Sequence, residues 1–210
     1  TRLDGKAFVT ALVPLLAHDA NAVQGLGEIL EAMPETMNRE MHRMWAKKMG
    51  LAEFSEELFA ELHALMAETP VDYTIFWREL SSLPRDVAAL RPAFYETRGG
   101  YSKGSVAMEA RWAKWLQKWH AALEREGCPP AGVSEAMRRV NPKYIPREWM
   151  MVEAYRSATD TGDYSLVQRL HNVLEDPYGE QSEAVAALYY KKKDEGFFGL
   201  GGTSHFSCSS

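Results

Sequence analysis

Apolar side chains recur at steps of three and four residues along most of this sequence. The longest such stripe covers residues 21–50, and the clearest one covers residues 105–126. This spacing places side chains on one face of an α-helix, whereas a half-buried strand needs alternation at every second residue. We find no alternating stretch bounded by turn residues, and no unit repeats at intervals of about 30 to 50 residues. The sequence therefore predicts an all-α fold and argues against solenoid repeats.

Proline and helix-capping residues divide the first half of this pattern into separate helices. We expect a short helix over residues 8–16 and a longer one over 21–50. Pro34 removes a backbone donor from the longer helix and should kink it or split it in two. Ser55 and Asp72 are the expected N-caps of the next two helices, because their side chains can accept from free backbone N–H groups.

The second half of the chain has further boundary signals. Ser134 should cap a short helix, and Pro146 should occupy the first turn of the helix that follows. Gly162 and Asp163 should end that helix and cap another.

Three segments have weaker patterns. We expect residues 85–104 to form a long loop with room for one turn of helix, and residues 182–193 to form a weak helix. The tail over 196–210 is rich in glycine and serine and is expected to be mobile.

Composition narrows the class of protein. The 210 residues are 46% hydrophobic, which suits a globular chain and excludes simple disorder. A formal net charge of −5 argues against a nucleic-acid partner, and no run approaches the roughly 18 apolar residues of a membrane span. Two cysteines are too few for a disulfide scaffold and fit a reducing compartment. Because the first residue is Thr1, we expect that the native start and any targeting segment are missing.

Two glycine-rich segments are candidate sites. Residues 100–104 match the Gly-x-Ser-x-Gly pattern of hydrolases, but no strand precedes them as that chemistry requires. The same segment and residues 196–202 could direct backbone N–H groups at a phosphate, yet neither has the Gly-Lys-Ser/Thr ending. A flexible loop is the favoured interpretation of both.

Histidine spacing does not predict a metal site. No two of the six histidines lie one helical turn apart with an acid between them. Four of them are expected on helix surfaces or at the core edge: His42, His63, His120 and His171. His205 and Cys208 lie three positions apart on the tail, which does not make a zinc site.

Aromatic and basic clusters also have structural interpretations. Trp112, Trp115 and Trp119 could stack on bases, but their spacing is that of a buried helix face. The three lysines at 191–193 are interpreted as the solvated end of a helix, because the run is short and acidic residues follow it.

Cys208 lies near the end of the chain, where its thiol should be exposed. The residues alone favour an inert surface cysteine, because reactivity requires a lowered pKa. Pairing with Cys128 and pairing with a cysteine outside this sequence both stay open.

Several stretches, taken together and in order, resemble the C-terminal part of the selenoprotein O family. Residues 12–16 and 44–51 look like helices of that family. The more specific matches are residues 71–74 with Phe76, Arg78 and Leu80, residues 141–144, Pro146 and Arg147, Glu153 and Ala154, residues 162–165, Pro177 and Tyr178, and the terminal residues 207–210.

The resemblance implies a protein adenylyltransferase with a protein-kinase-like fold. Such an enzyme transfers AMP from ATP to Ser, Thr or Tyr hydroxyls of protein substrates, with Mg²⁺ as the expected metal. Residues 1–195 would form the helical C-terminal lobe and extension of that fold, and residues 196–210 a flexible tail. Cys208 is the residue that the resemblance associates with redox control. The implied partners are protein substrates and an upstream kinase-like domain, with neither nucleic acid nor a membrane.

The residues that bind ATP and metal in kinase-like folds are missing from this sequence. It has no Asp-Phe-Gly and no Gly-rich loop followed by a strand lysine. Residues 42–44 lie in an apolar helical stripe and lack the aspartate of a catalytic loop. We therefore expect the ATP and Mg²⁺ sites to lie upstream and the fragment alone to be inactive.

Three hypotheses follow. The leading one is a C-terminal fragment of a protein adenylyltransferase with redox regulation through Cys208. The others are a non-catalytic all-helical interaction or scaffold protein and a thiol redox protein acting through Cys208. The compartment stays open, with mitochondria expected for a eukaryotic source and the cytoplasm for a bacterial one.

Overall fold

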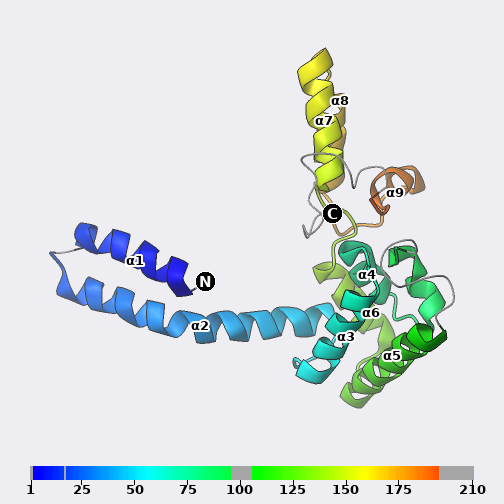
Figure 1. The fold of residues 1–210 in the computed structure, drawn as a ribbon, viewed down its shortest axis with the longest axis horizontal. Coiled ribbons are helices and arrows are strands. Elements are labelled where there is room, and N and C mark those ends of the chain that lie inside the picture. The colour runs from blue at the N-terminus through cyan, green and yellow to red at the C-terminus, as the bar shows by residue number, and fades with distance from the viewer. Residues whose placement is uncertain (1, 17, 96–105, 194–210) are drawn as a thin grey trace. The chain divides into compact units, whose positions relative to one another are not determined.

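The computed structural model describes residues 2–16, 18–95 and 106–193 and confirms the all-α prediction over them (Figure 1). The helices are α1 (Arg2–Leu16), α2 (Ala20–Lys48), α3 (Glu56–Glu68), α4 (Tyr73–Leu80), the 3₁₀ helix η1 (Val87–Ala93), α5 (Val106–Glu126), α6 (Pro130–Val140), α7 (Glu148–Thr161), α8 (Ser165–Leu174) and α9 (Glu183–Tyr189). Within these ranges, strand-like pairing is limited to one antiparallel bridge between Val71 and Phe94. None of these helices is long and apolar enough to cross a bilayer.

The chain divides into two compact units, residues 1–46 and 47–210, which are described separately. The first unit contains α1 and most of α2. After α1 the Asp19 N–H donates to the Leu16 carbonyl at 2.8 Å, and α2 then runs back along α1 (Figure 1). Of the two outcomes expected at Pro34, the split into two helices is wrong, because α2 continues as one helix on both sides of it, and the kink stays a prediction. The ring removes one helical hydrogen bond, and the remaining turns continue the helix.

The core of the second unit is built around α5. Three tryptophans on one face of this helix are almost completely buried, which confirms their assignment to core packing. Their indole N–H groups also fasten α5 to three other segments. The bonds run from Trp112 to the Thr69 hydroxyl at 3.1 Å, from Trp115 to the Leu58 carbonyl at 2.9 Å, and from Trp119 to the Met49 carbonyl at 2.8 Å.

Two of the expected caps are confirmed and two boundary predictions are wrong. Ser55 accepts from the Leu58 N–H, and Asp72 accepts from the Ile75 N–H. Ser134 is not a cap, because α6 already begins at Pro130; its hydroxyl donates instead to a carbonyl at the end of α4. Pro146 lies just before the cap residue of α7 and not in its first turn.

The stretch expected to be a long loop is partly ordered. Residues 87–93 form η1, which packs against α4 and α5, and its Val87, Leu90 and Ala93 are buried. The remainder, residues 96–104, lies outside the described residues. Gly162 ends α7 in the left-handed conformation, as predicted. The weak helix expected over 182–193 is the shorter α9, capped by the Ser182 hydroxyl.

Candidate functional site

A buried ion pair joins the start of α4 to the start of α7. Asp72 and Arg147 face each other with side chains that are 0% and 1% exposed. The guanidinium donates from Nη1 to Oδ2 at 2.6 Å and from Nη2 to Oδ1 at 2.9 Å. The carboxylate also accepts from the Ile75 N–H at 3.0 Å and from the Tyr95 hydroxyl at 3.3 Å. Both carboxylate oxygens are therefore engaged, as a buried charge requires.

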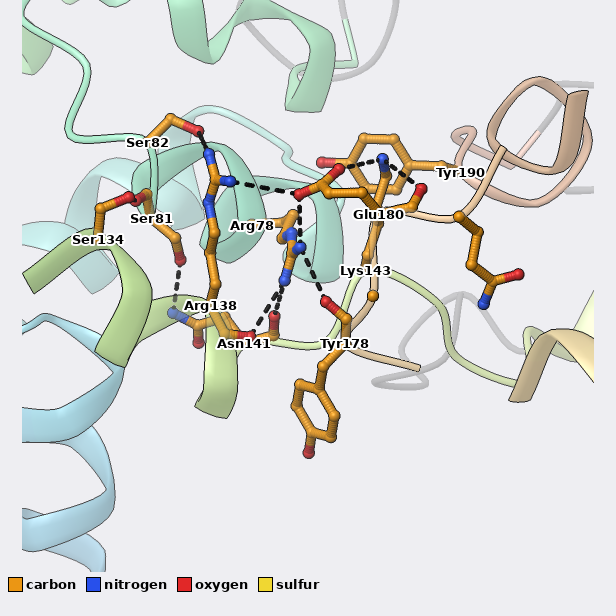
Figure 2. A network of polar contacts seen from close by, with 12 residues as sticks. Arg78, Ser81, Ser82, Ser134, Arg138, Asn141, Lys143, Tyr178, Glu180 and Tyr190 are labelled. Atoms are coloured by element: carbon orange, nitrogen blue, oxygen red, sulfur yellow. Dashed lines mark hydrogen bonds and ion pairs between the residues drawn. The ribbon is translucent and has the colours of Figure 1, made fainter. Parts of the chain in front are cut away.

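Arg78, two turns along α4, is the second centre of buried charge (Figure 2). Its Nη1 donates to the carbonyls of Arg138 at 3.1 Å and Asn141 at 3.0 Å. Its Nη2 donates to the carbonyl of Tyr178 at 3.0 Å and to Oε1 of Glu180 at 2.7 Å. Carbonyls at the end of a helix lack helical donors. Arg78 therefore caps the end of α6 and fastens the segment after α8 to it.

Glu180 lies among three cationic side chains (Figure 2). Besides Arg78, it contacts Lys143 Nζ at 2.7 Å and Arg138 Nη1 at 3.4 Å. The hydrogen bond from Lys143, followed by that from Arg78, lowers the pKa of Glu180 to about 2, against the opposing effect of burial. Its backbone carbonyl accepts from the Tyr144 hydroxyl at 3.0 Å. Glu180 therefore remains ionised at neutral pH and serves as a hydrogen-bond acceptor.

Asn141 joins the last turn of α2 to this network. Its Oδ1 accepts from Lys48 Nζ at 2.8 Å, and its Nδ2 donates to the Lys48 carbonyl and to the Ser81 hydroxyl, both at 3.0 Å. The Lys48 ammonium also lies 5.2 Å from the centre of the Trp77 ring. Burial lowers the pKa of Lys48 to about 8, because desolvation disfavours its charged form. The side chain of Asn141 thus links α2, α4 and α6.

Two tyrosines complete these contacts. Burial and the charge of Asp72 raise the pKa of Tyr95 to about 12. Burial and the neighbouring Glu79 raise the pKa of Tyr190, whose hydroxyl donates to that carboxylate at 2.7 Å. Both hydroxyls therefore stay protonated at neutral pH. We call this set of contacts around Asp72, Arg78 and Asn141 the polar core; its donors and acceptors hold helices together and are not arranged for proton transfer.

Several candidates from the sequence fall outside the described residues or on helix surfaces. Cys208, His205 and residues 100–104 and 196–202 lie outside the described ranges, so the roles considered for them stay predictions. His120 is at the core edge, as predicted, with its Nε2 2.8 Å from the Pro84 carbonyl. The exposed histidines on helix surfaces are His42, His63 and His171.

The lysine run at 191–193 is only partly the solvated helix end that its sequence predicts, because Lys191 is exposed but Lys192 is half-buried. α9 ends at residue 189, and the lysines pack onto other parts of the unit. Lys191 lies 5.1 Å from the centre of the Trp149 ring, and Lys192 lies 5.7 Å from the centre of the Tyr95 ring. Lys193 is buried. Aliphatic stems and ring faces together make this packing favourable.

A cavity of about 380 Å³ lies between α5, the start of α6 and the segment after α4. Leu83, Leu123 and Val133 contribute apolar walls, and His120 and Cys128 also line it. Cys128 is exposed, and its thiol lies 3.9 Å from the Glu126 carbonyl.

Side chains that bind metal ions do not gather within the described residues. Within them, no group of three or more His, Cys, Asp or Glu side chains is arranged to hold a metal ion. The cationic groups closest to a phosphate-binding arrangement are Arg78, Arg138 and Lys143, and they already contact Glu180. We therefore assign no ATP or Mg²⁺ ligand to this part of the chain.

Comparison with known proteins places the sequence of this chain in a family. Residues 6–175 match the family model described as protein adenylyltransferase SelO. The chain belongs to the SelO family. The match begins in α1 and runs to the end of α8, and so includes nearly all residues of the polar core.

Curated relatives of this SelO chain are bacterial proteins named protein nucleotidyltransferase YdiU. The protein from Xanthomonas oryzae pv. oryzae (strain MAFF 311018) is 32% identical over 206 residues, which cover 95% of this chain and 38% of the relative. The protein from Aromatoleum aromaticum is 34% identical over 211 residues, with 97% and 38% covered. The protein from Thiobacillus denitrificans is 34% identical over 185 residues, with 84% and 34% covered. The chain thus spans little more than a third of the relatives' length.

Four residues of the polar core, Asp72, Arg78, Asn141 and Arg147, are among those that carry the resemblance to the SelO family. Sequence reasoning assigned Asp72 to a helix cap and gave no role to Arg78, Asn141 or Arg147. The signal that could have found them was a charged residue on an otherwise apolar helix face, as at Arg78 between Trp77 and Leu80. Such a residue must meet a buried partner.

Proposed function

We propose that this chain is the helical scaffold part of a protein adenylyltransferase. The reaction is transfer of AMP from ATP to a Ser, Thr or Tyr hydroxyl of a protein substrate. The hydroxyl oxygen bonds to the α-phosphorus, the bond to the β-phosphate oxygen breaks, and pyrophosphate leaves. The observation that carries this proposal is membership of the SelO family over most of the chain.

We assign the ATP and Mg²⁺ sites to the part of the protein that this chain does not match. Two observations support this assignment. The chain covers only about 38% of the length of the relative from Xanthomonas oryzae, and the charged groups of the polar core already bind other helices. In this proposal the chain is the helical C-terminal lobe and extension of a kinase-like fold, and its partners are the upstream kinase-like domain and protein substrates. Family membership favours this function over a non-catalytic interaction protein.

The test follows the labelled phosphate. A longer protein, containing this chain joined to the remainder of a family member, is incubated with Mg²⁺ and ATP labelled at either the α- or the γ-phosphate. We expect protein-bound label from α-labelled ATP and none from γ-labelled ATP. The 210-residue chain alone serves as the matched control and should incorporate neither. Label arriving only from the γ-phosphate would refute the adenylyltransferase assignment.

For the tail, we propose redox regulation through Cys208. The longer protein with Cys208→Ser should keep AMP transfer in reducing buffer and lose the difference between reducing and oxidising buffer. Cys128→Ser is the matched control for the exposed second thiol. Loss of all AMP transfer in reducing buffer would instead favour a thiol redox protein.

A further inference from the structure

The middle of α2 carries an apolar face that nothing in its own unit buries. Leu26, Leu30 and Met33 follow one another at helical spacing and are half-buried. The same stripe continues at steps of three and four through Met37, Met41 and Met44. These three side chains are 49%, 47% and 45% exposed. We call Met37, Met41 and Met44 the methionine face.

The first unit does not close a core of its own. Among its described side chains, from residue 7 onward, none before Ala46 is buried. Phe8, Leu15 and Ile29 are also more than 60% exposed. Two helices bury too little surface to offset the entropy cost of ordering them, so a stable form needs cover from elsewhere. Clustered exposed apolar residues mark surfaces that meet another body.

We propose that the methionine face docks onto the part of the SelO-family protein that this chain does not match. This inference rests on the proposed function, in which that part carries the nucleotide site. The family model includes the methionine face, and the matched relatives are more than twice as long as the match. Methionine is flexible and polarisable, and it suits a surface that must adapt to a partner of varied shape.

The area of the face argues against a second copy as its occupant. Three half-exposed methionines offer on the order of 300 Å² at most, whereas a stable dimer buries about 800 Å² per partner. Docking within one chain needs less area, because the two parts are already linked and act at a high effective concentration.

The experiment compares methionine oxidation in two settings. One is this chain alone, and the other is a fusion in which it replaces the segment that it matches in the Xanthomonas oryzae relative. Both are treated briefly with peroxide, and sulfoxide at each methionine is measured by mass spectrometry. In the chain alone, Met37, Met41 and Met44 should oxidise fast, while the buried Met49 and Met137 stay protected. In the fusion, oxidation of the methionine face should slow roughly tenfold, in line with the loss of its exposed surface.

A matched pair of double variants tests docking by placing charge on α2. Met37→Glu with Met41→Glu places two charges on the methionine face, one turn apart. Ala32→Glu with Thr36→Glu places the same charges at the same spacing at exposed positions of α2 outside the methionine face. In the fusion, only the first pair should raise the oxidation rate of Met44 to its rate in the isolated chain. If this fusion does not fold, a fusion to the Aromatoleum aromaticum relative, in which the two parts are again covalently linked, provides the same readout.

The outcomes separate this inference from the proposed function. Equal oxidation of the methionine face in both settings, in a fusion that transfers AMP, overturns the docking and leaves the adenylyltransferase standing. Protection in a fusion that transfers no AMP supports docking and counts against the proposed function. Protection in the isolated chain, together with a dimeric mass by light scattering, identifies a second copy as the occupant and overturns the proposal.

Discussion

Breaking the Asp72–Arg147 pair should be among the most damaging single changes in the second unit. Arg147→Met keeps most of the stem volume and leaves the Asp72 carboxylate buried without its two guanidinium bonds. Asp72→Asn keeps a side chain that can cap α4 and leaves the guanidinium without its counter-charge. Removing one partner of a buried ion pair typically lowers the free energy of unfolding by about 3–5 kcal/mol, because the remaining charge is desolvated and unpaired.

The double variant decides whether this reasoning is right. With both charges gone, neither side chain is a buried unpaired ion, so Asp72→Asn with Arg147→Met should cost no more than either single change. The double-mutant cycle should then show a coupling energy at least as large as the cost of one single change, about 3–5 kcal/mol. The control is Arg85→Met, which breaks a pair with Glu124 in which both side chains are more than 60% exposed. That change should cost less than about 1 kcal/mol.

Urea and thermal unfolding followed by tryptophan fluorescence measure these values. For a unit of this size each kcal/mol moves the melting temperature by about 2–4 °C, so Arg147→Met should lower it by roughly 6–20 °C. If Arg147→Met costs no more than Arg85→Met, or if the double variant costs the sum of the singles, the pair is not the buried charge lock described above.

Two further predictions follow from the end of α2 and the turn after it. Because the folded pKa of Lys48 is lowered to about 8, the folded state binds fewer protons than the unfolded state between pH 8 and about 10. The free energy of unfolding should therefore rise with pH across pH 8–9.5, and Lys48→Met should remove that rise; an equal pH slope in the variant would contradict it. Gly50 has φ +72°, and a Cβ there would lie 2.7 Å from Met137 Sδ, whereas Gly127 has φ +67° and open space around it. Gly127→Ala should cost about 1–2 kcal/mol for the left-handed backbone alone, and Gly50→Ala should cost more in the same urea titration; equal costs would show that the Met137 contact is relieved without penalty.

Much of the helical fold could be predicted because helical period and boundary residues are local signals. The face of α5 is set by tryptophans at steps of three and four, and the ends of α3 and α7 by Ser55 and Gly162. The failures occurred where a tertiary contact decides. Ser134 has the chemistry of a cap, yet its hydroxyl donates to the Ser81 carbonyl, 53 positions away, and α6 begins before it. The lysines at 191–193 look solvated in sequence because the rings they pack on lie far away along the chain.

The contacts of the polar core could not be predicted from local sequence signals, because they also join residues far apart in the chain. Arg78 contacts residues 60 to 102 positions away, and Asp72 contacts a residue 75 positions away. Helical spacing reports which face a residue occupies, but it does not report the partner across the core. The resemblance includes Asp72, Arg78, Asn141 and Arg147, but it does not state which of them are in contact.

The two units of this chain differ in what they bury: the second unit buries charged side chains, and the first unit exposes apolar ones. In the second unit, buried charges such as Arg78 and Arg147 look at first like catalytic groups, but their hydrogen bonds end on helix carbonyls and on a capping carboxylate. Replacing a buried ion pair by well-packed apolar side chains often leaves the free energy of unfolding unchanged or higher. The contribution of such charges is therefore to fix one register between the helices. In the first unit the apolar side chains, which normally indicate a core, are exposed. The second unit, which buries its charges, therefore packs a core of its own. The first unit leaves the methionine face uncovered, and this is the surface that needs a partner.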